Sequence, residues 1–166
     1  HTLKDRVKLW KEGRQRRFRA HEKYKHIKKR IMPQIRYEYF SFCFERNPFD
    51  KAVSRYFWSI RNESEKPDVD DFIERVPARL LSNWSLYTVR NNVAVDYVGS
   101  FENLRQELNR VASILGLPEE IPLFRAKSGY RKDRRHYSAL LGQKSRERIE
   151  RVCSRELKEF GYKWQG

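Results

Sequence analysis

The chain carries an arginine and a serine eight residues apart, Arg46 and Ser54, whose types and spacing could bind a phosphate group. Arg46 follows a nearly unbroken apolar run, Tyr39–Phe44, and the apolar residues after it recur with helical spacing. A continuous apolar run is typical of a strand that is buried on both faces. We therefore predict a strand, a tight turn and a helix, with Arg46 at the carboxyl end of the strand, where open α/β sheets bind ligands.

The predicted turn has the chemistry of an anion site. A guanidinium group can bind a phosphate with two parallel hydrogen bonds, and a hydroxyl and free N–H groups at a helix start can add to them. Pro48 suits the first helical position, and Asp50 suits the first turn, where the helix dipole favours a carboxylate. The alternative is an ordinary strand–helix unit with a solvated arginine and an incidental serine.

The segment FCFERNPFDKAVSRYFW resembles the 3′-phosphate-binding segment of carbohydrate-type sulfotransferases, which has an RNP-F/W-D-K-x-V-S core. The resemblance runs from about His21 to the C-terminus and includes Leu86–Leu104, Ala126–Tyr137 and Glu156–Trp164. These enzymes use 3′-phosphoadenosine 5′-phosphosulfate (PAPS). The resemblance therefore implies transfer of a sulfuryl group from PAPS to a hydroxyl acceptor, which we expect to be an acidic or neutral glycan, without a metal.

The resemblance also implies a role for individual residues. Arg46 and Ser54 would hold the 3′-phosphate of the nucleotide. Lys127 and Arg131 match positions in the loop that closes over the nucleotide, Lys127 as a point charge and Arg131 as a fork of donors. A solvated basic loop is the alternative for the last two residues.

His21 is the candidate general base by the same resemblance, because it precedes Arg46 by 25 residues, as a histidine does in the family. An acceptor hydroxyl is a poor nucleophile until its proton is removed, and histidine exchanges a proton near neutral pH. His1 and His26 are further candidates for this role. The alternative is an exposed histidine on a basic helix.

The expected architecture is a single sulfotransferase-like domain over residues 1–166, with an α/β, P-loop-like three-layer fold, a short parallel sheet and many helices. The family's first strand–loop–helix unit carries a K-T-G/A-T/S loop that holds the 5′-phosphosulfate. No such run precedes Arg46, and Gly13 is the sole glycine before Gly99. We therefore expect this sequence to correspond to the C-terminal portion of a sulfotransferase, with further residues upstream of His1.

Local patterns predict the remaining elements. Ser100 is expected to cap a helix that has Glu102 in its first turn and that ends at Gly116, and Gly161 is expected to cap the last helix. The other predicted elements are helices at His21–Ile31, Asp68–Val76 and Ser145–Phe160, and a hairpin of Leu86–Val89 with Val93–Val98.

Composition restricts the partners without selecting one. Charged residues make up 36% of the chain and the net charge is +15, so anions are the expected ligands. Nucleic acid is disfavoured, because few aromatic residues interleave the basic residues 1–36. The competing hypothesis is a basic nucleic-acid- or glycan-binding module without catalysis.

The two cysteines, Cys43 and Cys153, show neither disulfide nor zinc spacing and are expected to be buried free thiols. There is no 18-residue apolar run, so no membrane span is expected. Two Asn-x-Ser sequons, at Asn62 and Asn83, matter only in a secretory host. The compartment stays open: cytoplasmic for a bacterial chain, Golgi for a eukaryotic one. The sequence gives no oligomeric state.

Overall fold

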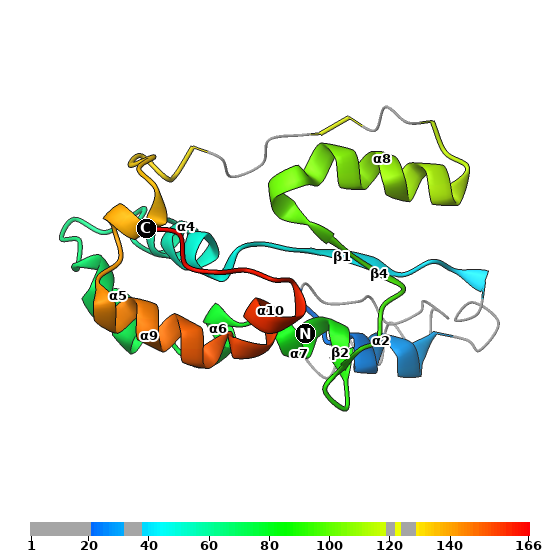
Figure 1. Cartoon of the computed structure of the whole chain (residues 1–166), viewed down its shortest axis with the longest axis horizontal. Helices are drawn as coiled ribbons and strands as arrows, with labels where there is room; N and C mark the ends of the chain where they lie inside the picture. The colour runs from blue at the N-terminus through cyan, green and yellow to red at the C-terminus, as the bar shows by residue number, and fades with distance from the viewer. Residues whose placement is uncertain (1–20, 32–37, 119–121, 124–128) are drawn as a thin grey trace, which may run out of the picture.

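The computed structural model describes residues 21–31, 38–118, 122–123 and 129–166 of the chain. Helices dominate these residues, and the strands are short (Figure 1). The helices and strands, in chain order, are α2 Tyr24–Arg30, β1 Phe42–Glu45, α4 Pro48–Ser59, α5 Val69–Arg75, α6 Ala78–Leu81, α7 Trp84–Tyr87, β2 Thr88–Val89, β3 Asn92–Val93, β4 Tyr97–Ser100, η1 Phe101–Asn103, α8 Leu104–Leu115, η2 Tyr137–Ala139, α9 Gln143–Val152 and α10 Ser154–Glu159.

The predicted strand–turn–helix unit is confirmed as β1 followed by α4. Pro48 is the first helical residue, and the Asn47 side chain caps the helix by accepting a hydrogen bond from the Phe49 N–H at 3.0 Å. β1 pairs with β4 in parallel, from Phe42 opposite Tyr97 to Glu45 opposite Ser100. The chain thus has a mixed helix and strand fold with a short parallel sheet, as expected for the α/β class.

The prediction of a single strand over Val93–Val98 is wrong. The chain forms the expected hairpin only at β2 and β3, whose turn residues Arg90 and Asn91 have φ values of 51° and 66°. It then leaves the hairpin, because the Asp96 carboxylate accepts hydrogen bonds from the Ser41 N–H (2.7 Å) and hydroxyl (2.5 Å). This contact sets the start of β4 beside the start of β1.

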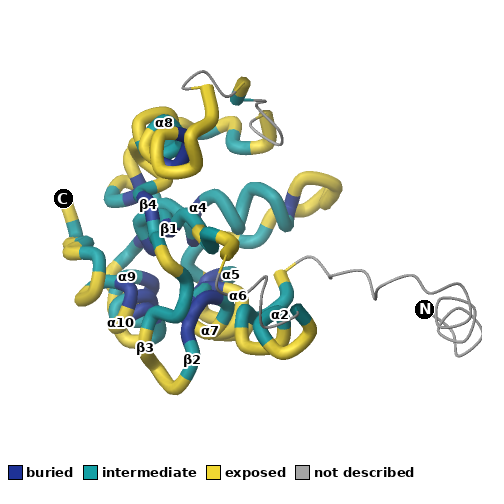
Figure 2. The backbone as a smooth tube through the Cα atoms, turned by 90° about the vertical axis from the view of Figure 1, so that its right-hand side faces the viewer, coloured by how far each residue is buried: buried dark blue, intermediate teal, exposed yellow. Residues whose placement is uncertain are grey.

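β1 is not buried on both faces, contrary to its apolar pattern. Phe42 is 39% exposed, because the parallel sheet of the described residues has two strands and leaves the start of β1 partly uncovered. α8 lies on one side of the two strands, and α7, α9 and α10 lie on the other (Figures 1 and 2). Gly99 permits close packing here, since an added Cβ would lie 2.9 Å from the Phe44 ring.

The main core lies where α4, α5 and α9 meet (Figure 2). Phe49, directly after Pro48, is fully buried. Its ring stacks on Tyr137 at 5.3 Å and meets Trp164 edge-on at 5.0 Å between centroids. The C-terminal segment is therefore packed against the first turn of α4, next to the predicted phosphate site.

The prediction of a single C-terminal helix over Ser145–Phe160 is also wrong, because the chain forms two helices there, α9 and α10, which are separated at Cys153. The division accompanies the inward placement of Glu156, which is fully buried. The two glycine caps are confirmed, with φ values of 64° at Gly116 and 69° at Gly161. Ser100 precedes η1 without capping it, because its hydroxyl donates to the Glu102 carboxylate at 2.8 Å.

Both cysteines are free, as expected; Cys153 is fully buried, whereas Cys43 is only half-buried. Among the described residues, every helix is too short or too polar to cross a membrane.

Candidate anion-binding site

Arg46 leaves the end of β1 and turns back over the first turn of α4. Its Nε donates to Oδ2 of Asp50 at 2.7 Å, and its Nη2 donates to the same oxygen. The guanidinium carbon also lies 4.9 Å from the centre of the Phe101 ring, and a quarter of the side chain is exposed. Asp50 therefore serves as a partner for Arg46 as well as a first-turn carboxylate of α4.

Arg131 reaches the same carboxylate from a distant part of the chain. Its Nη1 donates to Oδ1 of Asp50, while Nε and Nη2 donate to the carbonyl oxygens of Asp133 (3.0 Å) and Arg135 (2.6 Å). Burial would raise the pKa of Asp50, but the hydrogen bond from Arg131 and the charge of Arg46 hold it below its usual value. Two of the predicted phosphate ligands thus meet on one carboxylate.

Ser54 lies one helical turn beyond Asp50 and one turn before Trp58, so the three residues follow one side of α4. The segment that carries Arg131 runs along this side: Arg131 contacts Asp50, and the Tyr130 ring lies 4.8 Å from the Trp58 ring, edge-on. Ser54 is half-buried, and no group in the described part of the chain forms a hydrogen bond with its hydroxyl. Arg46, Ser54 and Arg131 therefore border one surface.

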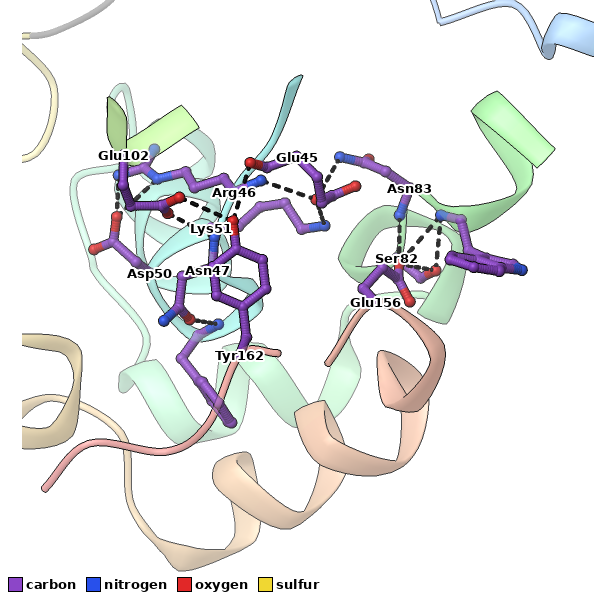
Figure 3. A network of polar contacts seen from close by, with 12 residues as sticks. Glu45, Arg46, Asn47, Asp50, Lys51, Ser82, Asn83, Glu102, Glu156 and Tyr162 are labelled. Carbon is purple, nitrogen blue, oxygen red and sulfur yellow. Dashed lines mark hydrogen bonds and ion pairs between the residues drawn. The ribbon is translucent and has the colours of Figure 1, made fainter. Parts of the chain in front are cut away.

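Lys51 contacts the buried Glu45 rather than this surface (Figure 3). Its Nζ lies 2.7 Å from Oε1 of Glu45, a residue that is 1% exposed. The same oxygen accepts the Arg46 N–H at 3.2 Å and lies 3.4 Å from Nδ2 of Asn83. No sequence pattern used above predicts this pair; the signal that could have indicated it is the position of Glu45 directly after an apolar run.

A second buried carboxylate, Glu156, supports the neighbouring segment (Figure 3). Its Oε1 accepts hydrogen bonds from the Ser82 hydroxyl (2.5 Å) and from the N–H groups of Asn83 and Trp84 (3.1 Å each). It thereby satisfies N–H groups at the start of α7, which have no partner within the helix. Sequence reasoning missed Glu156, because its partners lie far away in the chain.

Glu102 links three segments around the Arg46 turn (Figure 3). Its Oε1 accepts the N–H of Asn47 at 2.7 Å, and its Oε2 accepts the hydroxyls of Ser100 at 2.8 Å and Tyr162 at 2.9 Å. Burial would raise the pKa of Glu102, but the hydrogen bonds from Asn47 and Ser100 hold it below its usual value. Glu102 therefore forms more hydrogen bonds than the predicted first-turn position alone would require.

In the described part of the chain, no hydrogen bond or ion pair joins the predicted base to these residues. His21 is exposed and has a left-handed backbone, with φ of 56°. Tyr24, three residues after His21, has its hydroxyl 3.2 Å from Oγ of Ser41. Ser41 lies just before the start of β1, whereas Arg46 lies just after the end of β1. His26 is also exposed. The roles of His21 and His26 stay predictions, and His1 and Lys127 lie outside the described residues.

Two cavities, of about 340 and 400 Å³, lie elsewhere than the surface that Arg46 and Arg131 border. The first is lined mainly by α5 and the segment before α6, with Arg55 and Ser59 from α4. The second is lined by α7, the end of α9, α10 and the hairpin. Arg46, Ser54 and Arg131 line neither of them. In the described ranges, no group of three or more His, Cys, Asp or Glu side chains is placed to hold a metal ion.

Comparison with known proteins adds one relative. The chain is 35% identical over 99 residues to an uncharacterized protein of Archaeoglobus fulgidus, in an alignment that covers 57% of this chain and 82% of the archaeal protein. The chain therefore belongs to the same family as that protein. No protein-family model and no solved structure matches the chain.

Proposed function

We propose that the chain binds the 3′-phosphate of PAPS and belongs to a sulfotransferase that modifies a hydroxyl acceptor, a glycan by preference. The observation that supports this proposal best is the meeting of Arg46 and Arg131 on the two oxygens of Asp50. Residues from two separate segments, selected by resemblance to one family, border one surface together with Ser54. Asp50 pairs with Arg46 four residues before it and with Arg131, which is 81 residues away, so the fold brings the two predicted ligands together.

The three residues fit a phosphate dianion chemically. Nη1 of Arg46 makes none of the hydrogen bonds to Asp50, so it keeps donors for a ligand. Each terminal nitrogen of Arg131 has a second hydrogen beyond those given to Asp50 and Arg135. The Ser54 hydroxyl adds a short neutral donor. Charge-assisted hydrogen bonds of this kind are among the strongest in proteins.

The proposed reaction is a direct transfer. The acceptor oxygen attacks the sulfur of PAPS as its proton passes to a base, for which His21 is the candidate. A new S–O bond forms, the S–O bond to the 5′-phosphate breaks, and 3′-phosphoadenosine 5′-phosphate leaves. The finer fold assignment, a P-loop-like three-layer arrangement with β1 and β4 in its parallel sheet, is part of the same proposal.

Calorimetric titration with 3′-phosphoadenosine 5′-phosphate and with AMP tests the proposal, since the two nucleotides differ by the 3′-phosphate alone. We expect the bisphosphate to bind at least tenfold more tightly, and Arg46→Ala to remove the difference. Arg79→Ala removes the same charge from an exposed position on α6 and should leave the difference intact. Equal affinity of the two nucleotides for the wild-type chain would refute the assignment.

A non-catalytic binding module for nucleic acid or glycan is the second candidate, and the net charge of +15 is the observation that favours it. Such a module would bind DNA, RNA or heparin with an affinity that falls steeply with salt, and it would not distinguish the two nucleotides. The titration above therefore separates the two functions.

A further inference from the structure

The backbone of Arg46 is held on both sides by one hydrogen-bonded pair, Glu102 and Tyr162. The N–H of Asn47 belongs to the peptide group after Arg46, and it donates to Glu102 at 2.7 Å. The carbonyl of Glu45 belongs to the peptide group before Arg46, and the Tyr162 hydroxyl lies 3.2 Å from it. The same hydroxyl lies 2.9 Å from Glu102. The single Tyr162 proton is shared between these two acceptors, so the peptide group after Arg46 is bonded to Glu102 and the peptide group before it contacts Tyr162.

The pair draws on two further segments of the chain. Glu102 lies in η1, where its neighbour Phe101 supports the Arg46 guanidinium from 4.9 Å. Tyr162 lies in the C-terminal segment, which Trp164 anchors against Phe49 at the start of α4. The turn, η1 and the C-terminal segment therefore meet around Arg46 (Figure 3).

We propose that Glu102 and Tyr162 are positioning residues that fix the direction of the Arg46 side chain for recognition of the nucleotide 3′-phosphate. The identity of the ligand in this inference rests on the proposed function. The positioning of Arg46 rests on the hydrogen bonds alone. Neither residue needs to touch the phosphate. A guanidinium on an unfixed turn would lose geometric precision, and with it the bidentate contact that distinguishes a phosphate.

Glu102→Gln and Tyr162→Phe test the inference, because each keeps the size of the side chain. Glu102→Gln removes the charge that strengthens the hydrogen bonds of the carboxylate, and Tyr162→Phe removes the hydroxyl beside the Glu45 carbonyl. The readout is the ratio of the affinities for 3′-phosphoadenosine 5′-phosphate and AMP in variants shown by circular dichroism to be folded. We expect each variant to lower this ratio roughly three- to tenfold. A merely structural role would lower the melting temperature and leave the ratio unchanged, which would overturn the inference.

Glu107→Gln is the matched control. Glu107 also accepts hydrogen bonds from β4, from the Ser100 N–H at 3.3 Å and from the Tyr97 hydroxyl, but makes none with the Arg46 turn. This variant should lose stability and keep the affinity ratio. If it lowers the ratio as much as Glu102→Gln does, the effect is not specific to the turn and the inference fails.

A nucleotide-free measurement separates this inference from the proposed function. The Arg46 Nε–H resonance, assigned with Arg46→Lys, should move or broaden in Glu102→Gln and Tyr162→Phe but not in Glu107→Gln. An unchanged resonance in the first two variants would overturn the positioning role. If the resonance responds while the wild-type chain fails to distinguish the nucleotides, the positioning of Arg46 stands and the 3′-phosphate function fails.

Discussion

Replacing Lys51 with methionine should destabilise the chain strongly, because it leaves the buried Glu45 carboxylate without its cation. Glu45 is 1% exposed, and Nζ of Lys51 lies 2.7 Å from its Oε1. The other donors to that oxygen are neutral and longer, at 3.2 Å from the Arg46 N–H and 3.4 Å from Asn83, and Oε2 has no hydrogen-bond partner in the described structure. Methionine keeps the apolar stem and removes the charge.

The expected loss follows from the uncompensated charge. Removing one partner of a buried ion pair costs about 3–5 kcal/mol. For a chain of this size, each kcal/mol lowers the melting temperature by about 2–4 °C, so a fall of roughly 6–20 °C is expected. Urea unfolding should show a lower midpoint and an unchanged m-value, because the surface exposed on unfolding stays the same. Lys66→Met, in an exposed loop, should change stability by less than about 0.5 kcal/mol.

A double variant tests the cause directly. Glu45→Gln/Lys51→Met removes both charges and should recover most of the stability that Lys51→Met loses, since a neutral amide is far less costly to bury. The reasoning is refuted if Lys51→Met loses less than about 1 kcal/mol, or if the double variant is no more stable than the single one.

Three other predictions follow from burial and pKa direction. Phe49→Ala should cost about 3–5 kcal/mol by calorimetry, because the ring is fully buried between two aromatic side chains; a near-wild-type melting temperature would contradict the packing. The lowered pKa values of Asp50 and Glu102 mean that their stabilisation is present above their unfolded pKa values, about 4, and is lost as pH falls further. Urea midpoints should fall from about pH 5 to pH 3, and less steeply in Asp50→Asn. Burial raises the pKa of Cys43 to about 11, with a smaller contribution from the nearby charge of Glu45. Burial likewise raises the pKa of Cys153 to about 12, with a smaller contribution from Glu156. A thiol reagent at pH 8 should therefore label both cysteines slowly until urea is added. Rapid labelling of folded Cys153 would be inconsistent with its burial.

Local sequence signals were sufficient to predict the strand–turn–helix unit that carries the candidate site. The apolar run, Pro48 and the helical spacing after it were sufficient to predict β1, the turn and α4, because each depends on neighbouring residues. The glycine caps at Gly116 and Gly161 were predictable for the same reason. The partner of β1 was not, because β4 is placed by the contact of Asp96 with Ser41, and these two residues are 55 positions apart in the sequence.

The carboxylates of the candidate site also form contacts with residues distant in sequence, which local patterns do not predict. Asp50 was predicted from the helix dipole, a local effect, yet its second oxygen binds Arg131. Glu45 and Glu156 are buried beside partners that no local pattern connects to them. A charged residue in a sequence window is ordinarily exposed, so only tertiary contacts identify the few that are not.

These contacts also change how the high net charge should be interpreted. Arg46 and Arg131 share Asp50, and Lys51 is paired with Glu45, so the cations closest to the turn are held by carboxylates. Such pairing reduces the local positive charge but fixes the direction of each donor. The surplus of positive charge must then come from other basic residues, whose long-range field attracts anions of any kind. Under the proposed function, selectivity for a phosphate at a defined position would therefore come from the paired arginines, whose geometry is fixed, and not from the net charge.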